Sequence, residues 1–264
     1  MNAVPVQVPG AASAGWAWDL DAIEAAVTPP TRVILYTNPC NPTGFAPREE
    51  HLLALGEIAE KHDLVVVEDQ AYEKFTHSID TITSAASLPG LRDRTVVSYS
   101  FHKNYSLHGW RAGFLAGPAE IIEPLLSVAI WVNLRVNHIT QAAATAALEG
   151  PQGWVQEMIR PYREGRNLLT EGLAGDPGIA VDVPATAGTM GYLNVTGLGL
   201  PADEAAETLM GEYGITTVPG PCFGPAAEPG EHLRIAFALA RDHPEPFSRV
   251  VETLKRASEE IRGR

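Results

Sequence analysis

Lys103 is surrounded in the sequence by residues that could support covalent chemistry at its amine. A lysine that forms a Schiff base with an aldehyde must first lose its proton, and cationic, partly desolvated surroundings favour that loss. Such a site also needs a cation for a phosphate, a carboxylate for a ring nitrogen and polar partners for a phenolate. Arg111, Asp69 and the pair Tyr72 and Asn41 supply these groups in turn. The sequence therefore predicts a site of covalent catalysis around Lys103.

Arg234 is a further candidate for binding an anion. It lies in the strand-like segment from Glu231 to Phe237, between apolar neighbours. A guanidinium in such a segment is costly to bury unless it meets an anion. We therefore expect either a ligand carboxylate or an internal ion pair beside it.

The segment from Asn38 to Gly44 contains two Asn-Pro pairs. Asparagine, proline and glycine form turns in any protein, so the segment predicts a tight turn before it predicts a function. A cis peptide bond before Pro42 would aim the side chain of Asn41.

The composition excludes several classes of function. The chain has 264 residues, with 19 Lys and Arg against 32 Asp and Glu, and a formal charge of −13. This acidity argues against nonspecific binding of nucleic acid or of an anionic membrane. The histidines show no metal-ligand spacing, so we expect no metal. Two cysteines and no apparent signal peptide favour the cytoplasm, and the apolar stretch Ile121 to Val132 is too short to span a bilayer.

The elements that must position these residues alternate between short β-branched runs and helical patterns. Alternation of this kind predicts an α/β domain with a largely parallel sheet, over residues 1–150. Ligands of open α/β sheets collect beyond the carboxyl ends of the strands, which is where Asn41, Asp69 and Lys103 fall. We expect strands at Val4–Val8, Val33–Tyr36, Leu64–Val67, Thr95–Ser98 and Ala112–Ala116, and helices at Leu20–Val27, Pro47–Lys61 and Asn137–Leu148.

Three of these elements carry further expectations. The strand Val33–Tyr36 should be buried, and Asp19 should cap the helix Leu20–Val27. Pro47 should occupy the first position of its helix, whose apolar face would consist of Leu52, Leu53, Leu55, Ile58 and Ala59.

The residues from Gly150 to Gly153 mark a break in the chain. The remainder, residues 151–264, has an α+β pattern and predicts a second, smaller domain. Its expected helices are Trp154–Leu173, Pro201–Tyr213 and Pro244–Ile261, and its expected strands are Ile179–Val183, Tyr192–Val195, Ile215–Val218 and His232–Phe237.

Together, the motifs resemble those of the class I/II aminotransferase family, the fold-type I pyridoxal-phosphate enzymes that include aspartate aminotransferase. Four separated segments occur in the family's order and at compatible spacing: Asn38–Gly44, Asp69–Tyr72, Ser98–Gly113 and Arg234. The resemblance implies an enzyme that uses pyridoxal 5'-phosphate to transfer an amino group between an amino acid and a 2-oxo acid.

The resemblance also implies roles at the ring of the cofactor. Lys103 would form the Schiff base and move the proton of the substrate's Cα. Asp69 would pair with the pyridine nitrogen and keep the ring cationic. Tyr72 and Asn41 would bond the phenolic oxygen, and Asn41 would also lie beside the substrate.

The resemblance also implies residues that bind the cofactor phosphate and the substrate carboxylate. Arg111 and the Ser100 hydroxyl would bind the phosphate, and Ser98 is either a further donor or an ordinary strand residue. Arg234 would bind the substrate's α-carboxylate. His102 replaces the small residue usual before the lysine, so its imidazolium could substitute for a hydroxyl at the phosphate, or its side chain could point away. Arg135 could reach a substrate or form a surface ion pair.

The family's chains also contain an upstream portion with a phosphate-binding helix start, a ring-stacking aromatic residue and further strands. Without it, we expect exposed sheet edges and apolar faces. A longer natural protein, a second chain supplying this portion, and a non-catalytic remnant or subunit are the alternatives. The expected partner is a second copy in a homodimer, or that second chain.

Other reactions on the same scaffold remain open: elimination, decarboxylation and cyclisation. Arg234 favours a substrate with an α-carboxylate but does not choose which bond breaks, and the substrate's side chain is left open.

Overall fold

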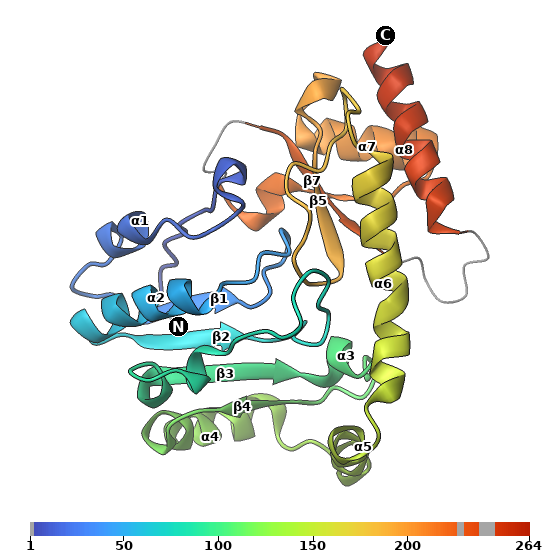
Figure 1. Cartoon of the computed structure of the whole chain (residues 1–264). Helices are drawn as coiled ribbons and strands as arrows, with labels where there is room; N and C mark the ends of the chain where they lie inside the picture. Colours follow the sequence, from blue (N-terminus) through green and yellow to red (C-terminus); the bar gives the residue numbers. More distant parts are fainter. Residues whose placement is uncertain (1–2, 226–229, 238–245) are drawn as a thin grey trace. The chain divides into compact units, whose positions relative to one another are not determined.

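The structure is a computed structural model, and it describes residues 3–225, 230–237 and 246–264 (Figure 1). The chain forms two compact units, which we describe separately. The sheet unit comprises Val27–Cys40 and Ala46–Ile159, and the C-terminal unit comprises Met1–Ala26, Asn41–Phe45 and Arg160–Arg264.

The sheet unit contains a four-stranded sheet in the order β1-β2-β3-β4 (Figure 1). The first three strands are parallel and the fourth is antiparallel to β3, as the predicted α/β class requires. In the pairing register Asp69 lies opposite both Thr37 and Ser98, so the three parallel strands end side by side. The strands are β1 (Val33–Thr37), β2 (Val65–Asp69), β3 (Thr95–Ser100) and β4 (Gly113–Ala116).

Four α-helices accompany these strands within the described part of the unit. They are α2 (Glu49–Lys61), α3 (Phe101–Asn104), α4 (Ala119–Asn133) and α5 (His138–Glu149). Two 3-10 turns, η2 (Ala85–Ser87) and η3 (Arg92–Arg94), precede β3.

Helix α2 follows the predicted amphipathic pattern with two corrections. Leu52, Leu55 and Ala59 are buried as the spacing indicates, but Leu53 is 40% exposed. The helix begins after Arg48, whose backbone N–H donates to the His51 ring nitrogen at 3.1 Å, so Pro47 lies outside the first turn.

Both edges of the sheet are unusually open. We expected β1 to be buried, and this was wrong: Leu35 is 69% exposed, because β1 is an edge strand. At the other edge, apolar side chains of β4, α4 and the next turn form what we call the α4/β4 apolar surface. It comprises Phe114, Leu115, Leu125, Leu126, Val128, Ile130, Trp131, Val132 and Leu134. A helix that is apolar on every side is normally buried, and α4 has no buried residue.

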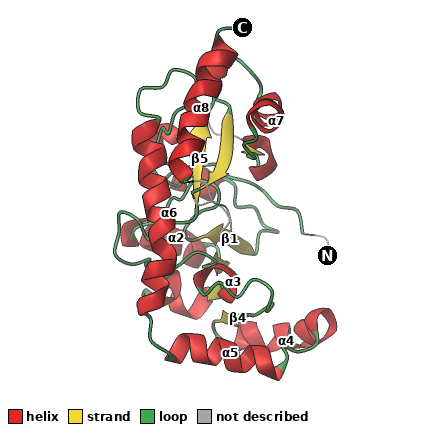
Figure 2. Ribbon diagram, turned by 90° about the vertical axis from the view of Figure 1, so that its right-hand side faces the viewer, coloured by secondary structure: helices red, strands yellow, loops and turns green. Residues whose placement is uncertain are grey.

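The C-terminal unit is an α+β structure around a three-stranded antiparallel sheet in the order β5-β7-β6. Figure 2 shows α6, α7 and α8 around this sheet. Its strands are β5 (Met190–Asn194), β6 (Val218–Pro219) and β7 (His232–Ala236), and its long helices are α6 (Gly153–Gly172), α7 (Ala202–Tyr213) and α8 (Phe247–Arg262). The shorter helical segments are η1 (Ala12–Ala14), α1 (Leu20–Ala25), η4 (Thr196–Leu198) and η5 (Gly220–Phe223).

The core of this unit unites the elements that the sequence predicted. Leu169 of α6, Leu193 of β5, Leu209 of α7 and Leu254 of α8 are at most 1% exposed and belong to one cluster. The changeover between units falls inside α6, between Ile159 and Arg160.

Three predicted strands do not form as expected. Val4–Val8 has no regular structure, since Val4 and Val6 are 84% and 69% exposed. Ile179–Val183 is reduced to a bridge between Ala180 and Asn194, because Asp176 draws the preceding backbone into a turn. Ile215–Val218 shrinks to the two residues of β6.

The remaining element boundaries agree closely. Asp19 caps α1 as predicted, through a 2.9 Å bond from the Ala22 N–H. The predicted start of the last helix at Pro244 lies outside the described residues. Among the described helices, none is both long and apolar enough to cross a membrane.

Candidate active site

Lys103 lies in the short helix α3, which begins where β3 ends. Ser100 is the N-cap of this helix, and its Oγ accepts a 3.2 Å hydrogen bond from the His102 N–H. The hydroxyl proton of Ser100 is not used in that contact, so the same group can still donate to an anion. The local fold therefore presents a lysine and a hydroxyl donor at the carboxyl end of one strand.

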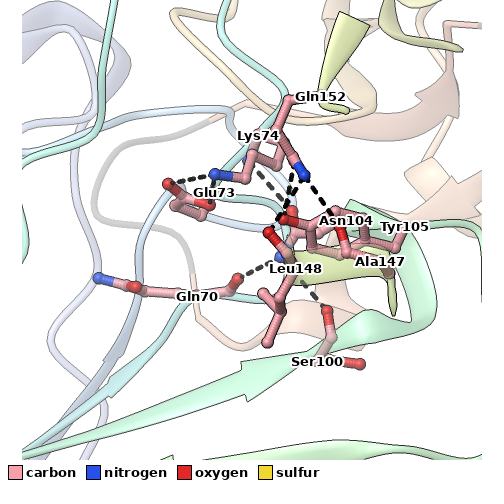
Figure 3. A network of polar contacts seen from close by, with 9 residues as sticks. All are labelled: Gln70, Glu73, Lys74, Ser100, Asn104, Tyr105, Ala147, Leu148 and Gln152. Carbon is pink, nitrogen blue, oxygen red and sulfur yellow. Dashed lines mark hydrogen bonds and ion pairs between the residues drawn. The ribbon is translucent and has the colours of Figure 1, made fainter. Parts of the chain in front are cut away.

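Asn104, directly after the lysine, fixes this helix to the neighbouring strand (Figure 3). Its side chain is fully buried and donates to the carbonyl oxygens of Gln70, at 3.0 Å, and Ser100, at 3.3 Å. Its amide oxygen accepts from the Lys74 N–H at 3.0 Å. One side chain therefore ties the ends of β2 and β3 together.

The same network continues into α5 (Figure 3). The Tyr105 hydroxyl donates to Gln152 Oε1 at 3.1 Å, and Gln152 Nε2 donates to the carbonyl oxygens of Ala147 and Gly150. These bonds satisfy backbone acceptors at the end of α5, which would otherwise lack partners. Sequence reasoning missed Asn104 and Gln152, because nothing in the sequence distinguishes a buried amide from an exposed one.

Asp69 is the last residue of β2 and is half-buried. Its Oδ1 accepts a 3.0 Å hydrogen bond from the Ala71 N–H. Burial raises the pKa of the Asp69 carboxyl above its usual value, and the Ala71 N–H offsets this only in part. A nearby cation would remove this penalty, so the position suits a carboxylate that meets a positively charged ligand group.

Glu68 precedes Asp69 in β2, but its contacts exclude it as the carboxylate that meets a ligand. Successive residues of a strand point to opposite faces, and Glu68 is fully buried. Its carboxylate accepts from Asn38 Nδ2 and from the Ser84 hydroxyl, each at 2.7 Å, and from the Ala85 N–H. Burial, with the Glu68 charge added, raises the pKa of Tyr36 far above its usual value. Glu68 thus organises the loop before η2.

The Asn-Pro segment has cis peptide bonds before both Pro39 and Pro42. The second agrees with the predicted geometry around Asn41. The segment leaves β1 in the sheet unit, and Asn41–Phe45 belong to the C-terminal unit. Tyr72 is half-buried in the turn after β2, where its carbonyl oxygen accepts from the Phe75 N–H at 2.9 Å.

Arg111 lies on the exposed loop between α3 and β4, with a left-handed backbone φ of 55°. Few non-glycine residues adopt this region, and it recurs at ligand-binding positions. Arg111 Nη1 donates to His102 Nδ1 at 3.3 Å. His102 and His108 stack edge to face with ring centroids 4.6 Å apart. Two imidazoles and a guanidinium therefore gather beside Lys103 and Ser100.

Arg234 lies in β7 of the C-terminal unit, opposite Tyr192 in the register. Its Nη1 donates to Asn41 Oδ1 at 3.1 Å, and its guanidinium lies 4.9 Å from the ring centre of Phe223. Among the described residues these contacts are with an amide and an aromatic ring, not with a carboxylate. A guanidinium with donors left over after one amide bond can still bind an anion bidentately.

The predicted residues thus fall into two groups. The sheet unit brings Asp69, Tyr72, Ser100, Lys103 and Arg111 to the carboxyl end of its parallel strands, and the C-terminal unit brings Asn41 and Arg234 together. Ser98 is half-buried in β3, and Arg135 is exposed after α4.

The first group fits the cofactor that the sequence implied. A half-buried carboxylate with a raised pKa suits the protonated ring nitrogen of a pyridine. A hydroxyl and a guanidinium suit a phosphate dianion, and the lysine between them suits an aldehyde. Within the described residues, no cluster of His, Cys, Asp and Glu has the arrangement of a metal site.

The fold and these motifs define the class: an α/β transferase fold of the fold-type I pyridoxal-phosphate enzymes. The family model "Aminotransferase class I and II" matches residues 1–246, and the chain belongs to that family. It is 32% identical over 254 residues to aromatic-amino-acid aminotransferase 2 of Thermococcus litoralis, covering 95% of this chain and 64% of that protein. It is 31% identical over 237 residues to an arginine–pyruvate transaminase of Pseudomonas aeruginosa, covering 90% and 59%.

Solved structures agree with this assignment. An aromatic aminotransferase from Pyrococcus horikoshii superimposes with a TM-score of 0.88 at 30% identity, over 97% of this chain and 67% of that one. The chain spans about three-fifths of the length of the curated relatives it matches.

Proposed function

We propose that this chain carries the cofactor lysine and the substrate arginine of a pyridoxal-phosphate-dependent aminotransferase, which moves an amino group between an amino acid and a 2-oxo acid. The observation that carries the proposal is the joint position of Lys103 and Asp69. Asn104 bonds the backbone of both strand ends, so the amine and the carboxylate are presented from one rigid edge. Membership of the aminotransferase family supports the same reaction.

Pyridoxal 5'-phosphate, when bound, supplies an aldehyde and a ring that accepts electrons. Arg111 and Ser100 would hold its phosphate, and Asp69 would keep its ring nitrogen protonated. Tyr72 and Asn41 would donate to its phenolic oxygen.

The amine of Lys103 would carry the proton of the substrate's Cα as a general base and then return it as a general acid. Arg234 would bind the α-carboxylate, and its bond to Asn41 would orient the guanidinium toward the substrate. The relatives act on arginine and aromatic amino acids by name, so the family context supports an amino-acid substrate without selecting its side chain.

We also propose that the active protein is an assembly in the cytoplasm. The open β1 edge and the α4/β4 apolar surface would be covered by further polypeptide of the kind that the longer relatives contain, or by a second copy in a homodimer. Cytoplasmic location is supported by the low cysteine content of the chain. Residues 1–150 and 151–264 would be the cofactor-binding and the small domain.

A half-reaction experiment tests the function. The protein is mixed with pyridoxal phosphate and one amino acid at a time, and the amino form of the cofactor and the 2-oxo acid are both quantified by chromatography. Equal amounts of the two products support amino transfer. Pyruvate and ammonia without the amino form of the cofactor would instead identify an elimination enzyme.

A further inference from the structure

The cluster of His102, His108 and Arg111 contains an unusual hydrogen bond between two basic side chains. A guanidinium can only donate, so His102 Nδ1 must accept the 3.3 Å bond from Arg111. The ring of His102 is therefore neutral, with its proton on Nε2. In this state one N–H of Arg111 is hydrogen-bonded to an imidazole.

His108 has a separate hydrogen-bond partner in the backbone. Its Nδ1 lies 3.2 Å from the carbonyl oxygen of Ser106, which can only accept, so Nδ1 carries the proton. The two rings meet edge to face at 65°, with centroids 4.6 Å apart. Each imidazole is thus oriented by a separate contact, and neither contact is an ion pair.

The surroundings keep His102 neutral. Partial burial lowers the pKa of its imidazole, and the positive charges of Lys103, His108 and Arg111 lower it further. All three charges lie on the same short segment, within nine residues of His102 in sequence. A dianion placed among these groups would reverse the balance, because it attracts the proton that the cations repel.

We propose that His102, with His108, forms the second side of a phosphate-binding site opened by Arg111, and that His102 takes up one proton from solvent when the phosphate binds. Arg111 would exchange the imidazole nitrogen for a phosphate oxygen, and the freed Nδ1 of His102 would accept the proton. The imidazolium would then donate to the phosphate in place of a hydroxyl. The identity of the phosphate, as that of pyridoxal phosphate, rests on the proposed function. The exchange of hydrogen bonds and the proton uptake rest only on the cluster of His102, His108 and Arg111.

A proton count tests the exchange. Binding of pyridoxal phosphate is measured by isothermal titration in buffers of different ionisation enthalpy, near pH 7.5, where the phosphate is already a dianion. We expect the wild type to take up more protons than His102→Gln, by up to about one per site. Glutamine keeps an N–H donor but cannot titrate, so it separates proton uptake from hydrogen bonding. His62→Gln, at the end of α2, is the matched control.

The pH dependence of affinity gives a second reading. The affinity of the wild type for pyridoxal phosphate should fall with rising pH relative to that of His102→Gln, by up to about tenfold per pH unit. Pyridoxal, which lacks the phosphate, should show no such difference between the two proteins.

A third measurement separates the sources of phosphate and the possible failures. The pKa of His102 is followed by NMR with and without inorganic phosphate, and we expect it to rise in the presence of either phosphate compound. Pyridoxal phosphate bound to Lys103 with equal proton counts in both proteins would overturn this inference and leave the proposed function standing. A rise with inorganic phosphate, but no cofactor on Lys103, would support the cluster and overturn the proposed function. No rise with either compound would overturn the inference.

Discussion

At the scale of single residues, the chemistry assigned to Lys103 depends on groups that the sequence identified separately. Asp69, Ser100 and Arg111 all lie at the ends of β2 and β3 or in the loop that follows. Arg234 meets Asn41 in the other unit. Substitutions of single residues can test each of these assignments.

Replacing Lys103 with alanine should abolish covalent attachment of pyridoxal phosphate, because Lys103 is the lysine of α3, directly after the carboxyl end of β3. Borohydride reduction followed by peptide mass mapping locates the modified lysine. Lys74→Ala is the matched control, since Lys74 is paired with Glu73 and should leave the attachment intact. Cofactor found on another lysine would contradict the assignment.

Asp69→Asn should change how the stability of the cofactor-free protein depends on pH. Burial raises the pKa of Asp69 in the folded state, so its contribution to stability is full below the unfolded pKa of about 4 and is lost as pH rises through the folded pKa. Asparagine cannot ionise. The unfolding free energy of Asp69→Asn should therefore rise relative to that of the wild type as the pH increases through this window.

Urea unfolding of both proteins at several pH values above about 4 measures the difference. Asp93→Asn, at an exposed residue of η3, provides the matched control for removing one aspartate charge. Parallel pH profiles for wild type and Asp69→Asn would show that Asp69 carries no burial penalty.

At the scale of elements, the helix α3 is short and depends on side-chain bonds. Four residues make too few backbone hydrogen bonds to be stable alone. Asn104 supplies the missing bonds by connecting α3 to the turn after β2.

Asn104→Ala should therefore destabilise the protein by about 2–3 kcal/mol, because it leaves a buried N–H and buried carbonyls without partners. Gln152→Ala, which removes more exposed bonds at the end of α5, should cost only about 1 kcal/mol. Denaturant unfolding compares the two. Equal, small losses would show that Asn104 does not join the strands.

The sequence predicted where the strands and helices lie better than it predicted how deeply they are buried. Alternation located β2, β3 and β4 and the helices α2, α5 and α7, since hydrophobic period depends only on which face meets a core. It failed at Val4–Val8, which has no regular structure, and at Ile179–Val183, which meets β5 only through the bridge between Ala180 and Asn194. The apolar run of β1 also predicted a buried strand. Burial of a strand depends on whether another strand or helix covers it, and the residues of β1 do not determine that.

The same limit applies to the candidate site. Residue type and order led to the prediction of Lys103, Asp69 and Arg111, because their chemistry is distinctive. They could not reveal Asn104, whose importance comes from full burial, nor the contact between Arg111 and His102, which requires the backbone of the loop to turn back.

At the scale of the whole molecule, the α4/β4 apolar surface is the dominant feature of the sheet unit. Trp131 is 88% exposed and Leu134 is 77% exposed. Exposed apolar side chains that gather on neighbouring elements are typical of interaction sites, so we expect the chain on its own to self-associate.

The double variant Trp131→Glu, Leu134→Glu should weaken that association at least about tenfold, because burying each large apolar side chain contributes about 1.5–3 kcal/mol. Sedimentation velocity over a range of concentrations measures the change. Met210→Glu, at an exposed apolar residue of α7, is the control. Unchanged association in the double variant would place the contact elsewhere on the chain.

The C-terminal unit is assembled from distant parts of the chain. Trp16 packs edge to face against Tyr192 at 5.4 Å, and Trp18 packs against Phe45. During synthesis on a ribosome, the short segment Asn41–Phe45 soon follows the first segment, but roughly 130 residues separate Ala26 from Arg160, where the remainder of the unit begins. At about 5–20 residues per second this delay lasts on the order of ten seconds. Trp16 therefore remains without its partner Tyr192 for that time, and its indole is open to a chaperone.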